Sequence, residues 1–348
     1  MTPERPVRVL IVDDSATVRA VVRRVLGHAA GFEIVGDASD GEAAVAAVLE
    51  EQPDVVLMDV EMPRLDGFAA TERIMALQPT PIVVLTSRAN RDHVHTAFEA
   101  MSRGAVEMLA KPEDPAGWES LTVSLPQVLR TAATLMRALP ARATRQERRP
   151  PAEAAERRTL RWVAIGASTG GPAAIRELLG VFPARPPVAV LVVQHIAAGF
   201  EEGFVEWLTK ELPLDVRIAR HGEVTPPGAV RVAPAGVHLH LAADGTLVLD
   251  RSLGPRGGHR PSVDELFLSC ARSSPIDTAG VLLTGMGSDG AHGLAALRAA
   301  GGLTLVQDES SAVVYGMPRV ALQQDPAHVV LPPASIGRVL VQCWSGRP

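Results

Sequence analysis

The sequence predicts two α/β domains joined by a solvated linker, and three observations support this prediction. The chain has 348 residues, enough for two domains of about 100 to 200 residues each. Short β-like runs alternate with helical periodicity along residues 1–125 and again along 159–348, a pattern typical of sheets with crossover helices. Between them, residues 126–158 are rich in Arg, Ala and Pro.

Five short apolar runs in the first domain are expected to form the strands of a parallel sheet. Between the first two runs, apolar residues from Val18 to Leu26 recur at i, i+3, i+4, i+7 and i+8, with Ser15 at the N-cap position. This spacing predicts a helix that packs one face on the sheet. The predicted strands are Val7–Val12, Ile34–Gly36, Val55–Met58, Ile82–Leu85 and Ala105–Leu109.

The linker is recognised by its composition. Seven arginines lie between Arg137 and Arg158, together with Pro140, Pro150 and Pro151. Such a segment has little apolar surface to bury, so we expect a solvated tether. An arginine-rich docking segment is the alternative interpretation.

Strand-like runs return after the linker, with helical stretches between them. The predicted helices are Ala173–Leu179, Val263–Ala271 and Leu294–Ala300. The predicted strands are Trp162–Ile165, Val188–Val193, Val216–Ala219, Val230–Val232, Leu247–Leu249, Gly280–Leu283 and Leu303–Val306. The second domain is therefore also expected to be α/β.

Composition narrows the class of protein. A net charge of −5 gives no general attraction to nucleic acid or to anionic membranes. The N-terminus carries no signal-peptide pattern, and no apolar run approaches the ~18 residues of a membrane span. The two cysteines, Cys270 and Cys343, show no metal or redox spacing, which fits packing thiols in a reducing compartment. We expect a soluble, cytoplasmic monomer without membrane insertion or a nucleic-acid partner.

Charged and polar residues close the strands of the first domain. Asp13 and Asp14 follow the first strand, Asp59 the third, Thr86 the fourth and Lys111 the fifth. In a doubly wound sheet these strand ends share one edge, where ligands bind. Clustered carboxylates suit Mg²⁺, and a metal beside Asp59 would stabilise a phosphoryl group on that carboxylate. Taken singly, the aspartate pair could be a helix cap and the lysine a loop residue.

The motifs "VLIVDDS", "DVVLMDVEMPRLDG", "IVVLTS" and "AKP" resemble the receiver domain of bacterial response regulators over roughly residues 5–122. This resemblance implies a flavodoxin-like (βα)₅ fold. It also implies Mg²⁺ at Asp14, Asp59 and the Glu61 carbonyl, with Asp13 supporting the site.

The same resemblance implies that a histidine kinase phosphorylates Asp59 and that Thr86 and Lys111 read out the phosphate. The sequence departs from the family pattern at Met108, three residues before the lysine, where many receivers carry an aromatic switch residue.

A glycine-rich corner opens the second domain. The sequence from Gly166 to Gly170 follows a predicted strand and precedes a helix opened by Pro172, which matches a nucleophile elbow that exposes Ser168. A phosphate-binding loop is the alternative. The stretch reads G-x-x-x-G-G, however, and lacks both the G-x-G-x-x-G spacing and a P-loop lysine.

A serine nucleophile needs a base and a carboxylate that orients the base. His195 follows the run Val188–Val193 and Gln194 at a strand end, whereas His238 and His240 fit alternating strand positions. The remaining candidates of this domain, His221, His259 and His292, lie in predicted loops. Asp289 stands in a glycine-rich turn after another buried strand; on its own it could be a turn aspartate.

The motifs "AIGASTGGP", "VVQHIAAGF", "RPSVDELF", "LLTGMGSDGA" and "QDESSAVVYGMP" resemble the CheB family of chemotaxis receptor glutamate methylesterases over about residues 159–340. The resemblance implies a doubly wound α/β methylesterase domain. It assigns Ser168 as nucleophile, His195 as general base and acid, Asp289 as orienting carboxylate and the Met286 N–H as oxyanion donor, with Thr169 lining the site.

That family hydrolyses glutamate γ-methyl esters on methyl-accepting chemotaxis receptors, releases methanol and can deamidate receptor glutamines. A CheA-type histidine kinase is the implied phosphodonor, and the unphosphorylated receiver is implied to cover the esterase site. Two rivals remain. A response regulator with a DNA-binding output is disfavoured because no helix-turn-helix signal follows residue 159. A catalytically silent signalling scaffold is disfavoured by the intact Ser, His and Asp.

Overall fold

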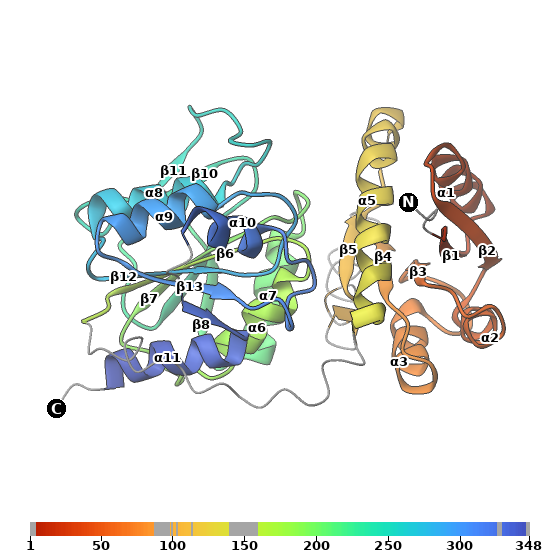
Figure 1. The fold of residues 1–348 in the computed structure, drawn as a ribbon, viewed down its shortest axis with the longest axis horizontal. Coiled ribbons are helices and arrows are strands. Elements are labelled where there is room, and N and C mark those ends of the chain that lie inside the picture. Colours follow the sequence, from red (N-terminus) through yellow and green to blue (C-terminus); the bar gives the residue numbers. More distant parts are fainter. Residues whose placement is uncertain are drawn as a thin grey trace. The chain divides into compact units, whose positions relative to one another are not determined.

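The computed structural model describes residues 5–86, 98, 100–101, 104–112, 114–138, 159–325 and 329–345. Its internal contacts divide the chain into two units, Met1–Thr144 and Arg145–Pro348, and each unit builds its own parallel sheet (Figure 1). This agrees with the two α/β domains predicted from the sequence.

The first unit contains a five-stranded parallel sheet in the order β2-β1-β3-β4-β5, which is the flavodoxin-like order. All five predicted strands are confirmed, and none of their ends shifts by more than two residues. The strands are β1 (Val7–Val12), β2 (Phe32–Ala38), β3 (Val55–Met58), β4 (Ile82–Thr86) and β5 (Glu107–Ala110). The helices named within the described part of this unit are α1 (Ala16–His28), α2 (Gly41–Glu51), α3 (Gly67–Leu77) and α5 (Pro115–Ala138).

Side chains alternate between the two faces of this sheet along each strand, and each face packs against a core cluster. In β1, Leu10 and Val12 pack into one core cluster, while Val9 and Ile11 pack into another. The predicted N-cap of α1 is also confirmed: the Ser15 hydroxyl accepts a hydrogen bond of 3.4 Å from the Val18 N–H. Because the strands are parallel, their carboxyl ends lie at one edge of the sheet, together with the polar residues that follow them.

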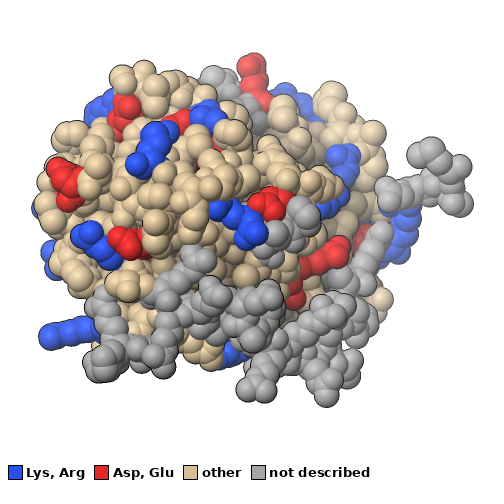
Figure 2. Space-filling model, turned by 60° about the vertical axis from the view of Figure 1, so that its left-hand side comes forward, with Lys and Arg blue, Asp and Glu red and all other residues tan. Residues whose placement is uncertain are grey.

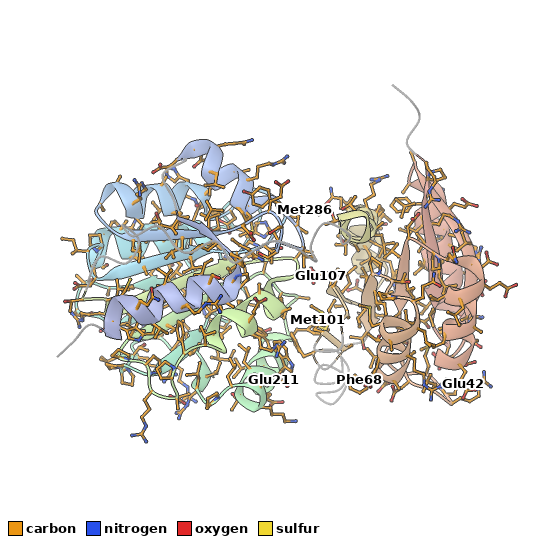
Figure 3. All side chains as sticks on the ribbon, turned by 60° about the horizontal axis from the view of Figure 1, so that its bottom comes forward. Glu42, Phe68, Met101, Glu107, Glu211 and Met286 are labelled. Carbon is orange, nitrogen blue, oxygen red and sulfur yellow. The ribbon has the colours of Figure 1, made fainter. Side chains whose placement is uncertain are left out.

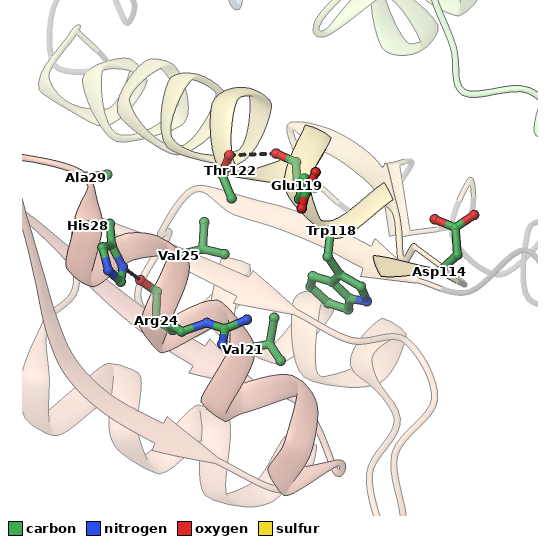
Figure 4. Close-up of a pocket in the computed structure, with 9 residues that line it drawn as sticks. All are labelled: Val21, Arg24, Val25, His28, Ala29, Asp114, Trp118, Glu119 and Thr122. Carbon is green, nitrogen blue, oxygen red and sulfur yellow. Dashed lines mark hydrogen bonds between the residues drawn. The ribbon is translucent and has the colours of Figure 1, made fainter. Parts of the chain in front are cut away.

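A cavity of about 790 Å³ opens between α1 and α5 (Figure 4). Apolar side chains from both helices line it, with a few charged residues around them. The lining residues are Val21, Arg24, Val25, His28, Ala29, Asp114, Trp118, Glu119 and Thr122.

Helix α5 continues past the domain end that the sequence predicted at residue 125. Leu125, Leu129 and Ala132 are buried against the sheet, so the helix extends the first unit as far as Ala138. Pro126 lies inside this helix, and a proline in a helical pattern usually signals its end. The first part of the predicted tether, residues 126–138, is therefore helical, and the rest of it, residues 139–158, lies outside the described residues.

The second unit contains a seven-stranded parallel sheet in the order β14-β13-β12-β6-β7-β9-β8. The strands are β6 (Trp162–Ala167), β7 (Ala189–Gln194), β8 (Asp215–Ile218), β9 (Ala229–Val232), β12 (Thr278–Leu282), β13 (Leu303–Gln307) and β14 (Val329–Leu331). The helices are α6 (Gly171–Leu179), α7 (Glu201–Glu211), α8 (Val263–Ser273), α9 (Ala291–Ala299), α10 (Met317–Gln324) and α11 (Pro333–Ser345).

A separate hairpin pairs β10 (His238–Leu241) with β11 (Leu247–Asp250). The predicted strand Leu247–Leu249 therefore exists, but it belongs to this hairpin. The predicted helices match α6, α8 and α9, whereas β14 was not predicted because it is only three residues long.

The strand order of this sheet indicates where a ligand would bind relative to the candidate esterase residues. The chain runs from β6 to β7 on one side and returns on the other side of β6 as β12, so the order reverses between β6 and β12. Ligands of open α/β sheets bind beside the carboxyl ends of the strands at such a point.

The surface carries both signs of charge. On the face drawn in Figure 2, Lys and Arg side chains are interspersed with Asp and Glu. Among the described helices, none combines the length and the apolar character that a membrane crossing requires.

Candidate active site

Three neighbouring strands bring the predicted esterase residues to one edge of the second sheet. Ala167 pairs with Gln194 at the ends of β6 and β7, so Ser168 and His195 are the next residues on adjacent strands. The His195 N–H donates to the Ala167 carbonyl at 2.9 Å, and the Ser168 N–H donates to the Thr284 carbonyl at 3.0 Å. These backbone hydrogen bonds fix both residues against their neighbouring strands.

Small residues around Ser168 permit the sharp turn from β6 into α6. Gly170 has φ of +74°, in the left-handed region that favours glycine. Gly285 lies against the serine: a Cβ there would be 2.7 Å from Ser168 Cβ. The turn predicted as a nucleophile elbow is thus a strand–turn–helix junction with Ser168 half-buried at its tip.

The structure brings His195 and Asp289 together. The His195 Nε2 atom lies 2.9 Å from Asp289 Oδ2, and both side chains are almost fully buried. The other ring nitrogen, Nδ1, is buried and has no hydrogen-bond partner among the described residues, so the ring makes no hydrogen bond to Ser168. Nδ1 is therefore the ring atom left to take a proton.

Asp289 is held by the first turn of α8. The Ser262 hydroxyl donates to its carboxylate at 2.8 Å, and the backbone N–H groups of Val263 and Asp264 donate at 2.8 and 3.0 Å. Burial disfavours the charged carboxylate, but the hydrogen bond with His195 and those from the backbone outweigh it and lower the pKa of Asp289 to about 2. A helix N-terminus favours such a negative charge.

The other two predicted site residues lie on loops beside Ser168. Met286 follows Gly285 on a loop at the edge of the unit (Figure 3). Thr169 follows Ser168, and its carbonyl accepts a hydrogen bond of 2.9 Å from the Thr284 hydroxyl. Thr284 thereby connects the loop of the serine to the loop of Met286.

The first unit gathers the predicted acidic residues. Carboxylate oxygens of Asp13, Asp14 and Asp59 lie within 4.8 Å of one another. The Lys111 ammonium lies 2.7 Å from Asp13 and 2.5 Å from Asp59. Three carboxylates against one ammonium leave negative charge in excess, and a set of oxygen atoms suits Mg²⁺. The residues present therefore fit a divalent cation.

Asp59 lies in a partly apolar setting. Burial raises the pKa of Asp59 to about 6; Lys111 opposes this, and Asp13 adds to it. The Thr86 hydroxyl is buried and has no hydrogen-bond partner within the described part of the chain, so it is available to a group on Asp59. Glu61, two residues after Asp59, is exposed, and Met108 on β5 packs against the core beside β4.

Known proteins resemble both units. The family model described as CheB methylesterase matches residues 163–340. The chain belongs to the CheB methylesterase family. A second model, described as response regulator receiver domain, matches residues 9–120.

Relatives in the CheB family match nearly the whole chain. A protein of Geobacter metallireducens named protein-glutamate methylesterase/protein-glutamine glutaminase 4 is 43% identical over 335 residues, which cover 95% of this chain and 96% of the relative. A similarly named protein of Symbiobacterium thermophilum is 40% identical and covers 97% of each. The crystal structure of the Thermotoga maritima CheB methylesterase catalytic domain has a TM-score of 0.51 at 34% identity, covering 53% of this chain and 98% of that one.

Two supporting residues of this CheB family site were missed by the sequence analysis. Ser262 begins a Ser-x-x-Glu capping box with Glu265, which signals a helix N-terminus and could have been recognised. The Gln194 amide donates to the carbonyls of Ser168 and His195, a role that depends on how two loops meet. A sequence pattern carries no signal for it.

Proposed function

We propose that this chain is a phosphorylation-activated serine esterase that hydrolyses glutamate γ-methyl esters on methyl-accepting chemotaxis receptors and releases methanol. The observation that carries the proposal is the arrangement at one sheet edge. Ser168 and His195 end adjacent strands, and the imidazole lies 2.9 Å from Asp289. Its relatives carry the name protein-glutamate methylesterase/protein-glutamine glutaminase.

The reaction proceeds in two halves. His195 takes the hydroxyl proton of Ser168 through the unpartnered Nδ1, and the serine oxygen attacks the ester carbonyl carbon. The Met286 N–H donates to the developing oxyanion. The intermediate then releases methanol, protonated by His195, and leaves an acyl-enzyme.

Water completes the cycle. His195 now accepts a proton from the attacking water, and hydroxide adds to the acyl carbon. The imidazolium then returns this proton to the departing Ser168 oxygen, which restores both residues and frees the receptor carboxylate. A glutamine side chain would pass through the same acyl-enzyme with ammonia as leaving group, which makes receptor glutamine deamidation part of the proposal. Thr169 lines the site.

Asp289 keeps His195 in the tautomer that the reaction needs. Because its pKa is about 2, it stays ionised at neutral pH. The carboxylate then accepts the hydrogen bond from His195 Nε2–H, which fixes the tautomer with a free Nδ1, and it stabilises the imidazolium that forms.

The receiver unit supplies control. A CheA-type histidine kinase transfers a phosphoryl group to Asp59, and Thr86 and Lys111 contact its oxygens. Asp14, Asp59 and the Glu61 carbonyl would hold Mg²⁺, with Asp13 supporting. The ion would neutralise charge that develops on the transferred group. Phosphorylation favours an active arrangement of the two units.

The proposed chemistry also implies the partners and the location of the protein. Its substrates are receptor glutamates and its phosphodonor is a kinase. We propose that it works as a cytoplasmic monomer and has no nucleic-acid partner. The esterase reaction itself requires no cofactor.

One assay tests the proposal. Receptor membranes carrying labelled methyl groups are incubated with wild-type protein, Ser168→Ala or Asp59→Asn, with and without a small-molecule phosphodonor, and released methanol is counted. Wild type releases methanol and is stimulated by the donor, Ser168→Ala releases none, and Asp59→Asn is not stimulated. The exposed Ser252→Ala is the matched control and behaves as wild type. Equal release by wild type and Ser168→Ala would contradict the esterase assignment.

A further inference from the structure

A second histidine lies flat against the ring of the proposed base. The rings of His195 and His259 are parallel within 3°, and their centroids are 3.9 Å apart. His259 lies 64 positions later in the sequence, in a loop between β11 and α8. Its ring covers one face of the imidazole whose edge is bound to Asp289.

A two-residue turn presents His259. The backbone N–H of Arg256 donates to the His259 carbonyl, and the N–H of His259 donates to the Arg256 carbonyl, both at 3.0 Å. The two residues between them, Gly257 and Gly258, have φ of +58° and +88°. Positive φ at both central positions defines a type I′ turn, which glycine adopts without strain. His259 is thus placed by a closed, hydrogen-bonded loop.

The same turn of α8 that holds Asp289 also anchors this loop. Arg256 forms ion pairs with Glu265 at 2.7 Å and with Asp264 at 3.5 Å, both in the first turn of α8. The N–H of Asp264 donates to the Asp289 carboxylate. Helix α8 therefore positions both neighbours of the His195 ring, which are the Asp289 carboxylate at its edge and the His259 imidazole on its face.

Geometry shows what the stack adds to the hydrogen bond. The contact with Asp289 fixes one atom of the His195 ring, Nε2, but leaves the ring free to turn about that contact. Such a rotation would swing Nδ1 away from its present position, and Nδ1 is the atom that must accept the Ser168 proton in the proposed reaction. A parallel ring at 3.9 Å blocks this motion on one side, because the two π systems would collide.

We propose that His259 is a positioning residue for the esterase reaction, which holds the imidazole of His195 in the plane where Nδ1 reaches the Ser168 hydroxyl. This inference rests on the proposed function. In the proposed reaction His259 takes part in no proton transfer and forms no bond to the substrate; it acts through the ring of His195. The flat ring is the feature required, and the ability of His259 to exchange protons is not.

The charge state of His259 is consistent with this role. Burial lowers the pKa of His259, the neighbouring His195 lowers it further, and Asp289 opposes both. His259 is then neutral at neutral pH, so it can remain stacked when His195 becomes an imidazolium during the reaction. A second positive ring at that distance would be repelled.

The test compares side chains that keep or lose the flat ring, in the full-length protein activated by a small-molecule phosphodonor. His259→Phe retains a ring, His259→Leu fills similar space without one, and His259→Ala removes both. We expect the Leu and Ala variants to lower kcat by about tenfold or more with KM within about twofold. His259→Phe should stay within about threefold of wild type. His221→Ala, an exposed histidine of the same unit, is the control.

A spectroscopic readout separates this inference from the proposed function. The His195 Nε2–H proton, hydrogen-bonded to Asp289, is followed by NMR in protein labelled at histidine nitrogens. The signal of this proton should stay sharp in wild type and His259→Phe and broaden in His259→Leu. The thermal midpoint of the Leu variant is measured alongside. An unchanged His195 signal in the Leu variant, or equal kcat in the Phe and Leu variants, overturns the positioning role. Absence of methanol release by wild type contradicts the proposed function but leaves the NMR comparison intact.

Discussion

The side-chain amide of Gln194 donates a hydrogen bond of 2.9 Å to the carbonyl oxygen of Ser168. The same nitrogen donates to the carbonyl of His195 at 2.8 Å, and Gln194 is almost fully buried. One amide thus joins the backbone of the proposed nucleophile to that of the proposed base. This side chain takes no part in the chemistry; it adds to the backbone hydrogen bond that already joins the ends of β6 and β7 between His195 and Ala167.

Replacing Gln194 by methionine should uncouple these two strand ends. Methionine has a similar length but no N–H, so two buried carbonyls lose their donor, at a cost of about 1–3 kcal/mol in the free energy of unfolding. We also expect kcat to fall, because Ser168 and His195 shift relative to each other. Urea unfolding and methanol release measure the two effects. Gln323→Met, at an exposed position on α10, should change neither.

The ionised state of Asp289 should make the second unit sensitive to acid. Its pKa is about 2 in the folded protein against 3.8 normally, so the folded state binds the proton less readily than the unfolded chain. The resulting stabilisation, on the order of 2 kcal/mol, is fully present above about pH 4 and is lost as the pH falls toward 2.

The comparison with Asp289→Asn isolates this contribution. The difference in unfolding free energy between wild type and the variant should have its full size at pH 5 and shrink as the pH falls from about 4 to 2. Fluorescence of Trp162 and Trp207, both buried in this unit, reports its unfolding. A difference that stays constant down to pH 2 would show that Asp289 has an ordinary pKa in the folded protein.

Much of the proposed site could be predicted because it depends on strand ends. Ser168, His195 and Asp59 each come directly after a buried strand, and parallel strands bring their carboxyl ends to one edge of each sheet. The sequence pattern therefore predicts both the strand and the place of the residue after it. No knowledge of distant contacts is needed for such residues.

The stacked His259 could not be found in this way. It belongs to a loop whose position depends on ion pairs between Arg256 and the first turn of α8, and these form only when the unit has folded. The two glycines before it predict a tight turn but not what the turn faces. The extension of α5 beyond residue 125 was obscured by Pro126, although Leu121, Leu125 and Leu129 continue the helical spacing of apolar residues.

Removal of divalent cations should abolish control without abolishing the esterase reaction. The acidic cluster lies in the first unit, whereas Ser168, His195 and Asp289 lie in the second. We expect a chelator to eliminate stimulation by the phosphodonor and to leave basal methanol release unchanged. By calorimetry, Asp14→Asn should weaken Mg²⁺ binding by about tenfold or more. Glu50→Gln, an exposed carboxylate of the same unit, serves as the control. If Asp14→Asn bound Mg²⁺ as wild type does, the metal assignment would be wrong.

Gly285 should tolerate no side chain, because two parts of the esterase site meet at its α-carbon. A Cβ added there would overlap the sulfur of Met317 and lie 2.7 Å from Ser168 Cβ, whereas Gly254 has open space around its Cβ position. Neither glycine has a positive φ, so a comparison of the two alanine variants tests space alone.

In Gly285→Ala, either Ser168 or the loop that carries Met286 must move, and the serine would no longer face both His195 and the oxyanion donor. A displacement of about 1 Å is enough to lower kcat by about 100-fold. Gly254→Ala should release methanol at the wild-type rate. Equal rates in the two variants would show that Gly285 does not set the position of Ser168. A loss of kcat without a matching loss in the free energy of unfolding would show that the contact serves catalysis, since a purely structural contact would lower both.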